Sequence, residues 1–446
     1  LKAFVYGLGM EDLGWPPATV LPDVELHLMT PGGRYSPRNY DERFHGPVRL
    51  REALANSYNV PAVFAANEVG VGRVLERLRE VGFRTLGETA EFYGPALALG
   101  DGEVRLYDLV GAYAAIARGG VHRPLRVVRA AADVSLPAPA AVDERRVMPE
   151  PVAAMLADML RDRSARVAAF GESSALDLPF EVAAKTGTSK GYRDNWTVGF
   201  TREVTVGVWV GNFDGRPMTK VSGITGAAPL FAAAMSAAMR RVTSEPAHAP
   251  ERDVAGVERV HVCALSGGAP GAGCKHVVDE IIPKGRVLAP CGMHETMKID
   301  TRNGLRATPS CPPRFVAERT FERFDGPFAS WAHAAGRADA PTSSSPLCGP
   351  LRAGEGGAGL RPDVAIRYPH DGARFLVDPD RPRSAQAIPL KVDAPASSMV
   401  ALFVDGRLAG RGAAGAPVYW ALERGEHAIV AEADGHRSEP VSILVE

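Results

Sequence analysis

Two short boxes of polar residues lie far apart in the sequence and carry side chains suited to acyl-transfer chemistry. They are Ser57-Tyr58-Asn59 and Lys185-Thr186-Gly187-Thr188-Ser189. Hydroxyl and amine groups act as nucleophiles, bases and proton carriers once neighbouring groups adjust their pKa values. A structural interpretation exists for each box, because Ser57 and Asn59 also suit a helix cap and a lone strand lysine is usually solvated. Their order and their strand and helix context favour a serine-type acyl-transfer site.

The elements that must position these boxes are helices followed by antiparallel strands. Apolar residues recur at helical spacing over 48–56, 71–81, 106–118, 150–162 and 227–241. Pro61 suits the first turn of a further helix directly after the first box. β-branched and aromatic residues predict strands over 179–188, 195–201 and 204–210. Arg202-Glu203 links the last two strands as a hairpin, and the whole order predicts an α+β domain over residues 1–245.

The remaining sequence divides into a connecting region and a small β domain. Proline, glycine and the cysteines are frequent over 246–360, where 341–346 and 354–359 have the composition of linkers. Residues 361–446 contain short strand-like runs at 388–392, 399–404, 417–422 and 427–432. Asp405-Gly406 and Arg424-Gly425 supply turn signals between them. An immunoglobulin-like sandwich and a generic small β module are both compatible with this pattern.

The five cysteines all lie in the C-terminal part of the chain, at positions 263, 274, 291, 311 and 348. Two disulfides and one free thiol would suit an oxidising compartment. Cys274, His276, Cys291 and His294 can also be written as a zinc set, but no C-x-x-C pair is present. We therefore expect disulfides or free thiols here, with no metal site and no cofactor.

Composition and charge exclude some classes of function and leave others open. Hydrophobic residues make up 46% of the 446 residues and charged residues 23%, so a sizeable core is expected. The net charge of −1 gives no electrostatic basis for binding nucleic acid or an anionic membrane. No apolar run reaches the ~18 residues needed to span a bilayer. The chain starts at Leu1-Lys2-Ala3 without a signal peptide, so we expect further sequence upstream.

Around both boxes the chain resembles the transpeptidase domain of class A, bifunctional penicillin-binding proteins, and is most similar to their C-type branch. The resemblance rests on LREALANSYNVPAV (50–63), LALGDGEVRLYDLVGAYAAIARGG (97–120), AAKTGTSKGYRDNWTVGFT (183–201) and VSGITGAAPLF (221–231). Tyr58 departs from the family's S-D-N box but leaves its serine and asparagine in place. The C-terminal stretches 366–375, 402–410 and 425–435 resemble the β domain appended to C-type members.

The N-terminal LKAFVYG (1–7) resembles the segment that follows the family's nucleophilic serine. In that family the serine stands three residues before a lysine, so if Lys2 is that lysine the serine lies two residues before Leu1. Ala3 departs from the proline that often follows the lysine. The resemblance implies that Lys2 is the general base, with its pKa depressed by the charge of Lys185. It also implies that Ser57 relays the proton to the leaving amine and that Asn59 positions the substrate amide and the lysine.

The second box supplies the substrate-binding residues that the resemblance implies. Thr186 and Thr188 share one face of a strand by the two-residue period and would bind the terminal carboxylate of a D-Ala-D-Ala stem. The backbone N–H of Thr188 would form half of the oxyanion hole. Gly187 would keep side-chain bulk away from the acyl group. The implied fold is a β-lactamase-like and penicillin-binding-protein-like antiparallel sheet with flanking helices, lacking its N-terminal strands, followed by the β sandwich.

The function implied is D,D-transpeptidation of peptidoglycan stem peptides on the periplasmic side of the inner membrane, with β-lactams as donor mimics. A glycosyltransferase domain and a membrane anchor would lie upstream, and other cell-wall synthesis proteins are candidate partners. A serine β-lactamase is disfavoured, because no E-x-x-L-N pattern lies between Asn59 and Lys185. A non-catalytic remnant is the alternative from another class. We expect the isolated chain to be poorly soluble, with the edge of strand 204–210 exposed, and unlabelled by fluorescent penicillin.

Overall fold

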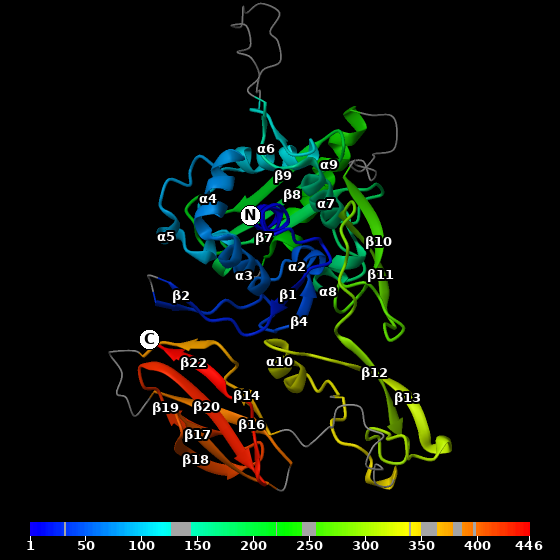
Figure 1. Ribbon diagram of the computed structural model, residues 1–446. Coiled ribbons are helices and arrows are strands. Elements are labelled where there is room, and N and C mark those ends of the chain that lie inside the picture. Colours follow the sequence, from blue (N-terminus) through cyan, green and yellow to red (C-terminus); the bar gives the residue numbers. More distant parts are fainter. Residues whose placement is uncertain are drawn as a thin grey trace, which may run out of the picture. The chain divides into compact units, whose positions relative to one another are not determined.

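The computed structural model describes residues 1–30, 33–125, 144–219, 221–242, 256–338, 340–348, 364–377, 386–395 and 398–446. The chain divides into two compact units, Leu1–Cys348 and Gly349–Glu446 (Figure 1). The domain boundaries expected near 245 and 360, and the linker expected at 354–359, lie outside the described residues. Those boundaries stay predictions.

The centre of the first unit is the N-terminal helix α1 (Lys2–Asp12), which is buried on every side over Lys2–Met10. A helix that is apolar around its whole circumference must be enclosed by other elements. The ring of Phe4 meets Phe83 and Tyr113 edge to face, with centroids 5.9 and 5.7 Å apart. Figure 1 shows α1 in dark blue among the surrounding helices.

The next helices of the first unit include those that the apolar periodicity predicts, together with two four-residue helices that it does not. They are α2 (Leu50–Ala55), α3 (Val60–Val69), α4 (Val71–Glu80), α5 (Ala90–Tyr93), α6 (Leu106–Ala117), α7 (Glu150–Arg161), α8 (Val167–Phe170) and α9 (Ala228–Val242). Pro61 lies in the first turn of α3, as expected. The 3₁₀ turns are η1 (Pro95–Leu99), η2 (Ser164–Arg166) and η3 (Lys190–Tyr192), and η4 (Gly223–Ala227) is a π-helical turn before α9.

An antiparallel sheet of β7 (Ala183–Thr188), β8 (Asp194–Phe200) and β9 (Thr205–Gly211) packs beside the helices. Its hairpin turns at Arg202-Glu203 as predicted, since the N–H of Thr201 donates to the carbonyl of Val204. A Cβ at Gly207 would lie 2.5 Å from Val110 Cγ2, so α6 packs directly on β9 there. Among the described residues β9 pairs with β8 alone, which leaves its other edge without a strand. The α+β fold is confirmed for this part of the chain.

Three short antiparallel strand pairs flank this arrangement, and the sequence analysis assigned none of them. β1 (Val20–Asp23) pairs with β4 (Gly46–Arg49), β2 (Leu28–Thr30) with β3 (Gly33–Tyr35), and β5 (Val121–His122) with β6 (Arg145–Arg146). These strands have at most four residues each, which is too short for a clear alternation of apolar and polar residues.

The cysteine-containing region carries two longer hairpins that the sequence analysis treated as connecting sequence. β10 (Val257–Cys263) pairs with β11 (Val277–Pro283), and β12 (His294–Asp300) pairs with β13 (Val316–Glu322). The turn η5 (Pro313–Phe315), helix α10 (Phe328–Ala334) and turn η6 (Pro346–Cys348) complete it. One disulfide joins Cys311 to Cys348, while Cys263, Cys274 and Cys291 are free thiols. The described cysteines thus form one disulfide and three free thiols, rather than two disulfides and one thiol.

The second unit is an all-β fold, as expected for residues 361–446. One sheet has the order β14-β16-β19 and the other β15-β22-β20-β17-β18, with β21 beside β20. The strands are β14 (Ala365–Tyr368), β15 (Ala373–Phe375), β16 (Ala387–Asp393), β17 (Met399–Val404), β18 (Arg407–Ala413), β19 (Val418–Ala421), β20 (Gly425–Ala433), β21 (His436–Arg437) and β22 (Val441–Val445). Asp405 and Gly406 turn between β17 and β18 with φ of 50° and 76°, the conformation of a tight hairpin turn.

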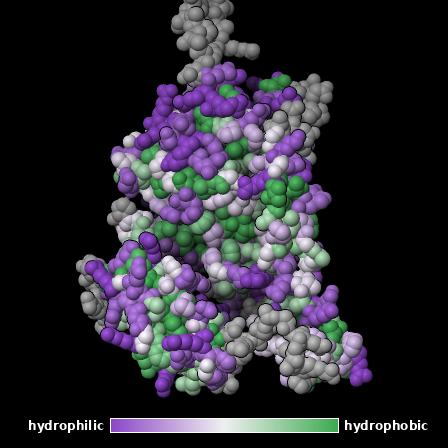
Figure 2. All heavy atoms as spheres, in the orientation of Figure 1, coloured by the Kyte–Doolittle hydropathy of each residue, from purple (hydrophilic) through white to green (hydrophobic). Residues whose placement is uncertain are grey.

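Hydrophilic side chains are spread over the face shown in Figure 2, with smaller hydrophobic areas between them. In the part of the chain that the structure describes, no helix combines the length and the apolar character that a membrane crossing requires.

Candidate active site

The structure brings together three of the predicted site residues at the start of α1. The amine of Lys2, which is 8% exposed, lies 2.6 Å from the Ser57 carbonyl oxygen and 2.7 Å from Asn59 Oδ1. It lies 3.1 Å from the Ser57 hydroxyl oxygen. An uncharged amine has two N–H groups, which the two carbonyl oxygens accept, and one lone pair. The Ser57 hydroxyl oxygen lies within hydrogen-bond distance of the same nitrogen, so a proton can pass directly between these two side chains.

The turn between α2 and α3 positions Ser57 and Asn59. The N–H of Ser57 donates to the Leu54 carbonyl, and Ser57 itself has a φ of 59°, a left-handed conformation that is uncommon for a side chain with a Cβ. Neither side chain caps a helix: Asn59 is the N-cap residue of α3 but makes no capping hydrogen bond. Its amide nitrogen instead donates to the carbonyl of Arg38, 2.8 Å away. The helix-cap interpretation of this box is therefore wrong.

A buried polar network supports the turn between α2 and α3. The sequence analysis missed this network. Asn39 Oδ1 accepts the N–H of Asn59 at 2.7 Å and that of Val60 at 3.3 Å. The amide nitrogen of Asn39 donates to both carboxylate oxygens of Asp23, at 2.7 and 2.8 Å. Asn39 is 3% exposed and Asp23 is fully buried, so each bond replaces one that water would otherwise make. The segment between β1 and β4 thus fixes the backbone on which Asn59 sits.

His45 connects the same network to the central residue of the first box. Its ring stacks on Tyr58 with centroids 4.1 Å apart and an interplanar angle of 17°. Its Nδ1 lies 2.5 Å from Asp23 Oδ2. Burial lowers the pKa of His45, but the hydrogen bond to Asp23 and the charges of Asp23 and Asp41 outweigh it, so the pKa is raised. In this chain Tyr58, which departs from the family pattern, packs on His45.

The second box places Lys185 on β7, 8% exposed, with its amine donating to the Thr186 carbonyl at 2.7 Å. Burial and the charge of Arg166 lower the pKa of Lys185 to about 7. Burial, followed by the charge of Lys185, lowers the pKa of Lys2 well below its ordinary value, while Asp23 opposes the shift. The lowered pKa of Lys2 agrees with its expected role as an uncharged base.

The residues predicted to bind substrate lie at the end of β7, beside η4. Thr188 Oγ1 accepts the N–H of Gly223 at 2.9 Å. A Cβ at Gly223 would lie 2.5 Å from the Gly187 carbonyl oxygen, so only a glycine allows η4 to approach β7 this closely. Thr186, Gly187 and Thr188 are half-buried, in contrast to the buried Ala183, Ala184 and Lys185. The end of β7 is thus more exposed than its start.

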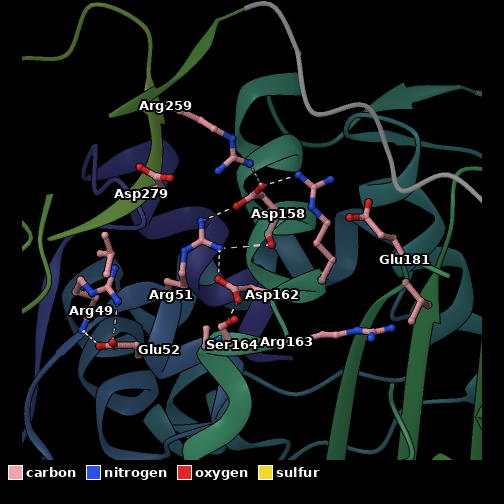
Figure 3. A pocket seen from close by; sticks show the side chains of 14 residues that line it. Arg49, Arg51, Glu52, Asp158, Asp162, Arg163, Ser164, Glu181, Arg259 and Asp279 are labelled. Atoms are coloured by element: carbon pink, nitrogen blue, oxygen red, sulfur yellow. Dashed lines mark hydrogen bonds and ion pairs between the residues drawn. The ribbon is translucent and has the colours of Figure 1, made fainter. Parts of the chain in front are cut away.

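A separate concentration of charge lies where α2, α7 and β11 meet, and it lines the pocket in Figure 3. Arg51 donates to Glu280 at 2.8 Å and pairs with Asp158 and Asp162 at 2.5 and 2.9 Å. None of the predicted site residues lines this pocket. Arg51 and its carboxylate partners thus join the helix before Ser57 to α7 and to the first of the cysteine-containing hairpins.

Comparisons with known proteins agree with the sequence resemblance. Residues 1–236 match the family model of the penicillin binding protein transpeptidase domain, and residues 355–443 match the penicillin-binding protein C-terminus family. Penicillin-binding protein 1C of Escherichia coli (strain K12) is 34% identical over 231 residues, covering 52% of this chain and 28% of that protein. Penicillin-binding protein 1A of Aquifex aeolicus (strain VF5) is 34% identical over 230 residues, covering 50% and 30%.

The fold resembles a solved structure as well. The crystal structure of penicillin-binding protein 1A from Haemophilus influenzae has a TM-score of 0.52 and 21% identity. The match covers 65% of this chain and 48% of that one. Compared with the two curated relatives named above, the chain spans less than a third of their length.

Proposed function

The chain belongs to the penicillin-binding protein transpeptidase family, as a C-terminal part of the class A kind, and from this premise we propose that it forms the D,D-transpeptidase module of a bifunctional cell-wall synthase. The observation that supports this function best is the cluster of Lys2, Ser57 and Asn59, in which burial and then the charge of Lys185 lower the pKa of Lys2. A lowered pKa favours the uncharged amine, which is the base that a serine nucleophile requires.

In the proposed reaction, the nucleophile is the serine that the family places two residues before Leu1. Its oxygen attacks the carbonyl carbon of the penultimate D-Ala while the uncharged amine of Lys2 takes its proton. Ser57, 3.1 Å from Lys2, passes a proton to the leaving D-Ala amine as the peptide bond breaks. An amine on a neighbouring strand then attacks the acyl-enzyme, forming the cross-link and returning the serine. A β-lactam would acylate the same oxygen.

Substrate binding is assigned to the end of β7. Thr188 Oγ1 already accepts the N–H of Gly223, which leaves its O–H free to donate to the terminal carboxylate of the stem peptide. Thr186 lies two residues earlier on the same strand face and adds a second hydroxyl. The N–H of Thr188 would stabilise the oxyanion, an interaction worth about 3–4 kcal/mol in comparable enzymes. Gly187 leaves room for the acyl group.

The rest of the proposed protein follows from its class. A glycosyltransferase domain and a membrane anchor would precede this part, placing it on the periplasmic side of the inner membrane. Peptidoglycan stem peptides are its proposed substrates, and cell-wall synthesis proteins are its proposed partners. The absence of an E-x-x-L-N pattern between Asn59 and Lys185 supports slow hydrolysis of the acyl-enzyme, unlike that in a β-lactamase.

The decisive experiment compares three polypeptides with fluorescent penicillin. The first begins at Leu1, the second carries the native upstream segment with serine in the S-x-x-K position, and the third carries the same segment with that serine changed to alanine. We expect covalent label in the second alone. Label in the first or third polypeptide would contradict the assigned nucleophile. A well-folded second polypeptide that stays unlabelled would contradict the transpeptidase function.

A further inference from the structure

Three free cysteines and one histidine of the first unit point their ligand atoms at one another. Cys263, Cys274, Cys291 and His294 each offer one such atom, and all four atoms lie within 4.8 Å of one another. His294 Nδ1 is 3.4 Å from the sulfur of Cys263, 3.7 Å from that of Cys274 and 3.3 Å from that of Cys291. One nitrogen thus faces three sulfurs at nearly equal distances.

These separations match the edges of a metal-centred tetrahedron. With Zn–S bonds of about 2.3 Å and Zn–N bonds of about 2.0–2.1 Å, tetrahedral angles place sulfur and nitrogen about 3.6 Å apart. The same bond lengths place two sulfurs about 3.8 Å apart. The three S···N distances of 3.3–3.7 Å lie around the first value, and the 4.8 Å limit accommodates the second.

The backbone is shaped to bring the four ligands together from distant positions. Cys263 ends β10, Cys274 lies in the loop to β11, Cys291 lies between β11 and β12, and His294 begins β12. The loop after β10 curls back on itself, since the N–H of Cys263 donates to the Gly268 carbonyl. Backbone bonds in both directions between Ala269 and the 289–291 segment then hold that segment alongside the loop.

Two glycines permit close approaches around the cluster. A Cβ at Gly273 would lie 2.9 Å from Thr296 Oγ1, so the loop carrying Cys274 contacts the hairpin that carries His294. Gly267 has a φ of +66°, and a Cβ there would lie 1.8 Å from the Ala18 carbonyl oxygen. The loop after Cys263 is thus seated against the segment between α1 and β1.

A disulfide within this group explains the arrangement less well. Three thiols cannot all pair, and a disulfide would give no reason for a histidine nitrogen at the centre of three sulfurs. The disulfide that the structure contains, Cys311–Cys348, lies elsewhere in the region. The N–H of Gly271 donates to the sulfur of Cys274 at 3.3 Å, the kind of bond that stabilises a metal-bound thiolate.

We propose that Cys263, Cys274, Cys291 and His294 bind one Zn²⁺ ion in a closed, structural Cys₃His site. Thiolate and imidazole ligands in a tetrahedron select zinc, and four protein ligands leave no open position for catalysis. The ion links hairpin β10–β11 to hairpin β12–β13. This site replaces the initial expectation of no metal. It also differs from the zinc set written from the sequence, because exposed His276 is not a ligand and buried Cys263 is.

The site is tested on the full chain, purified without chelator and analysed for metals by mass spectrometry. We expect one zinc per chain, and three thiols that react only after denaturation with a chelator. Substituting Co²⁺ into the chain should give the strong visible absorption of a tetrahedral cobalt centre with thiolate ligands. His294→Ala and Cys291→Ser should each reduce the zinc content at least tenfold at a chelator concentration that leaves the original chain loaded.

His276→Ala is the matched control, because it removes an exposed histidine from the same hairpin and should leave the zinc content unchanged. A chain with no zinc and one reactive thiol would overturn the proposal in favour of a disulfide. Stoichiometric iron would overturn the assignment to zinc. A Co²⁺ spectrum without tetrahedral bands in the unaltered chain would overturn the proposed geometry, whether or not the variants fold.

Discussion

Two polar clusters of the first unit, built on different principles, can be compared directly. The Lys2–Ser57–Asn59 cluster lies against a continuous core of helices α1, α2, α3, α6 and α7, and Asn39 and Asp23 satisfy its backbone. The Cys263–Cys274–Cys291–His294 cluster lies among hairpins in which few side chains join that core. The first cluster is preorganised by the fold around it, whereas the second, as proposed, supplies the bonds that hold its own hairpins together.

The largest expected effect is on the chemistry of the first cluster. In a polypeptide that carries the upstream serine, Lys2→Met should lower the rate of acylation by fluorescent penicillin about 10²–10⁴-fold, because the general base is lost. Lys391→Met changes an exposed lysine of the second unit and serves as the control. Acylation rates come from a time course of covalent labelling. A less than tenfold change in Lys2→Met would remove Lys2 from the mechanism.

The two clusters also differ in how far the sequence predicted them. Ser57-Tyr58-Asn59 and Lys185-Thr186-Gly187 are contiguous boxes at the ends of strongly periodic elements, so their meeting at Lys2 could be inferred by resemblance. Their roles stay predictions, although the contacts agree with them. Asn39 and Asp23 were missed, because they lie in an irregular segment of short strands where neither helical nor strand periodicity marks a buried residue.

The metal ligands had a sequence signal that was given too little weight. Cys291 and His294 form a C-x-x-H pair, which places two ligands on one turn just as a C-x-x-C pair does. The other two ligands depend on how β10 and β11 pair. That register places Cys263 opposite Val277 and leaves the 264–276 loop to fold back, which spacing alone does not reveal. The zinc set written from the sequence therefore contains His276 in place of Cys263.

Removing the metal should destabilise the hairpins of the second cluster and leave the helical core around the first cluster largely unchanged. With a strong chelator, we expect amide hydrogens of β10–β13 to exchange at least 100-fold faster, because metal binding energy becomes folding energy in sites of this kind. Amides of α1 and α3 should change much less, since a helical core protects them. Hydrogen exchange followed by mass spectrometry resolves both regions. Equal acceleration in both would show that the hairpins and the core unfold as one unit.

The pH dependence of stability tests the surroundings of Lys185, whose charge acts on the first cluster, and it requires no enzyme activity. The pKa of Lys185 is lowered to about 7 from 10.5, so between these values the unfolded state binds more protons than the folded state. Stability should therefore rise as the pH increases from about 7 to 10.5. Lys185→Met removes the buried charge and should stabilise the chain at pH 7 by about 2–4 kcal/mol, an amount that shrinks as the pH approaches 10.5. Denaturant unfolding at several pH values measures this, and a parallel pair of curves would contradict it.

The smallest effect concerns Tyr58, the residue that departs from the family pattern. Its ring stacks on His45, and His45 is bound to Asp23, so Tyr58 supports the turn by packing while its neighbours contact Lys2. Tyr58→Ala should cost about 1 kcal/mol of stability from lost stacking. Acylation should fall less than tenfold, because Ser57 and Asn59 keep their backbone bonds through Leu54 and Asn39.

The His45→Ala,Tyr58→Ala double variant tests the stacking itself. Its loss of stability should differ from the sum of the two single losses, since the two rings share one contact. Additive losses would mean that the stacking of the two rings contributes nothing to stability.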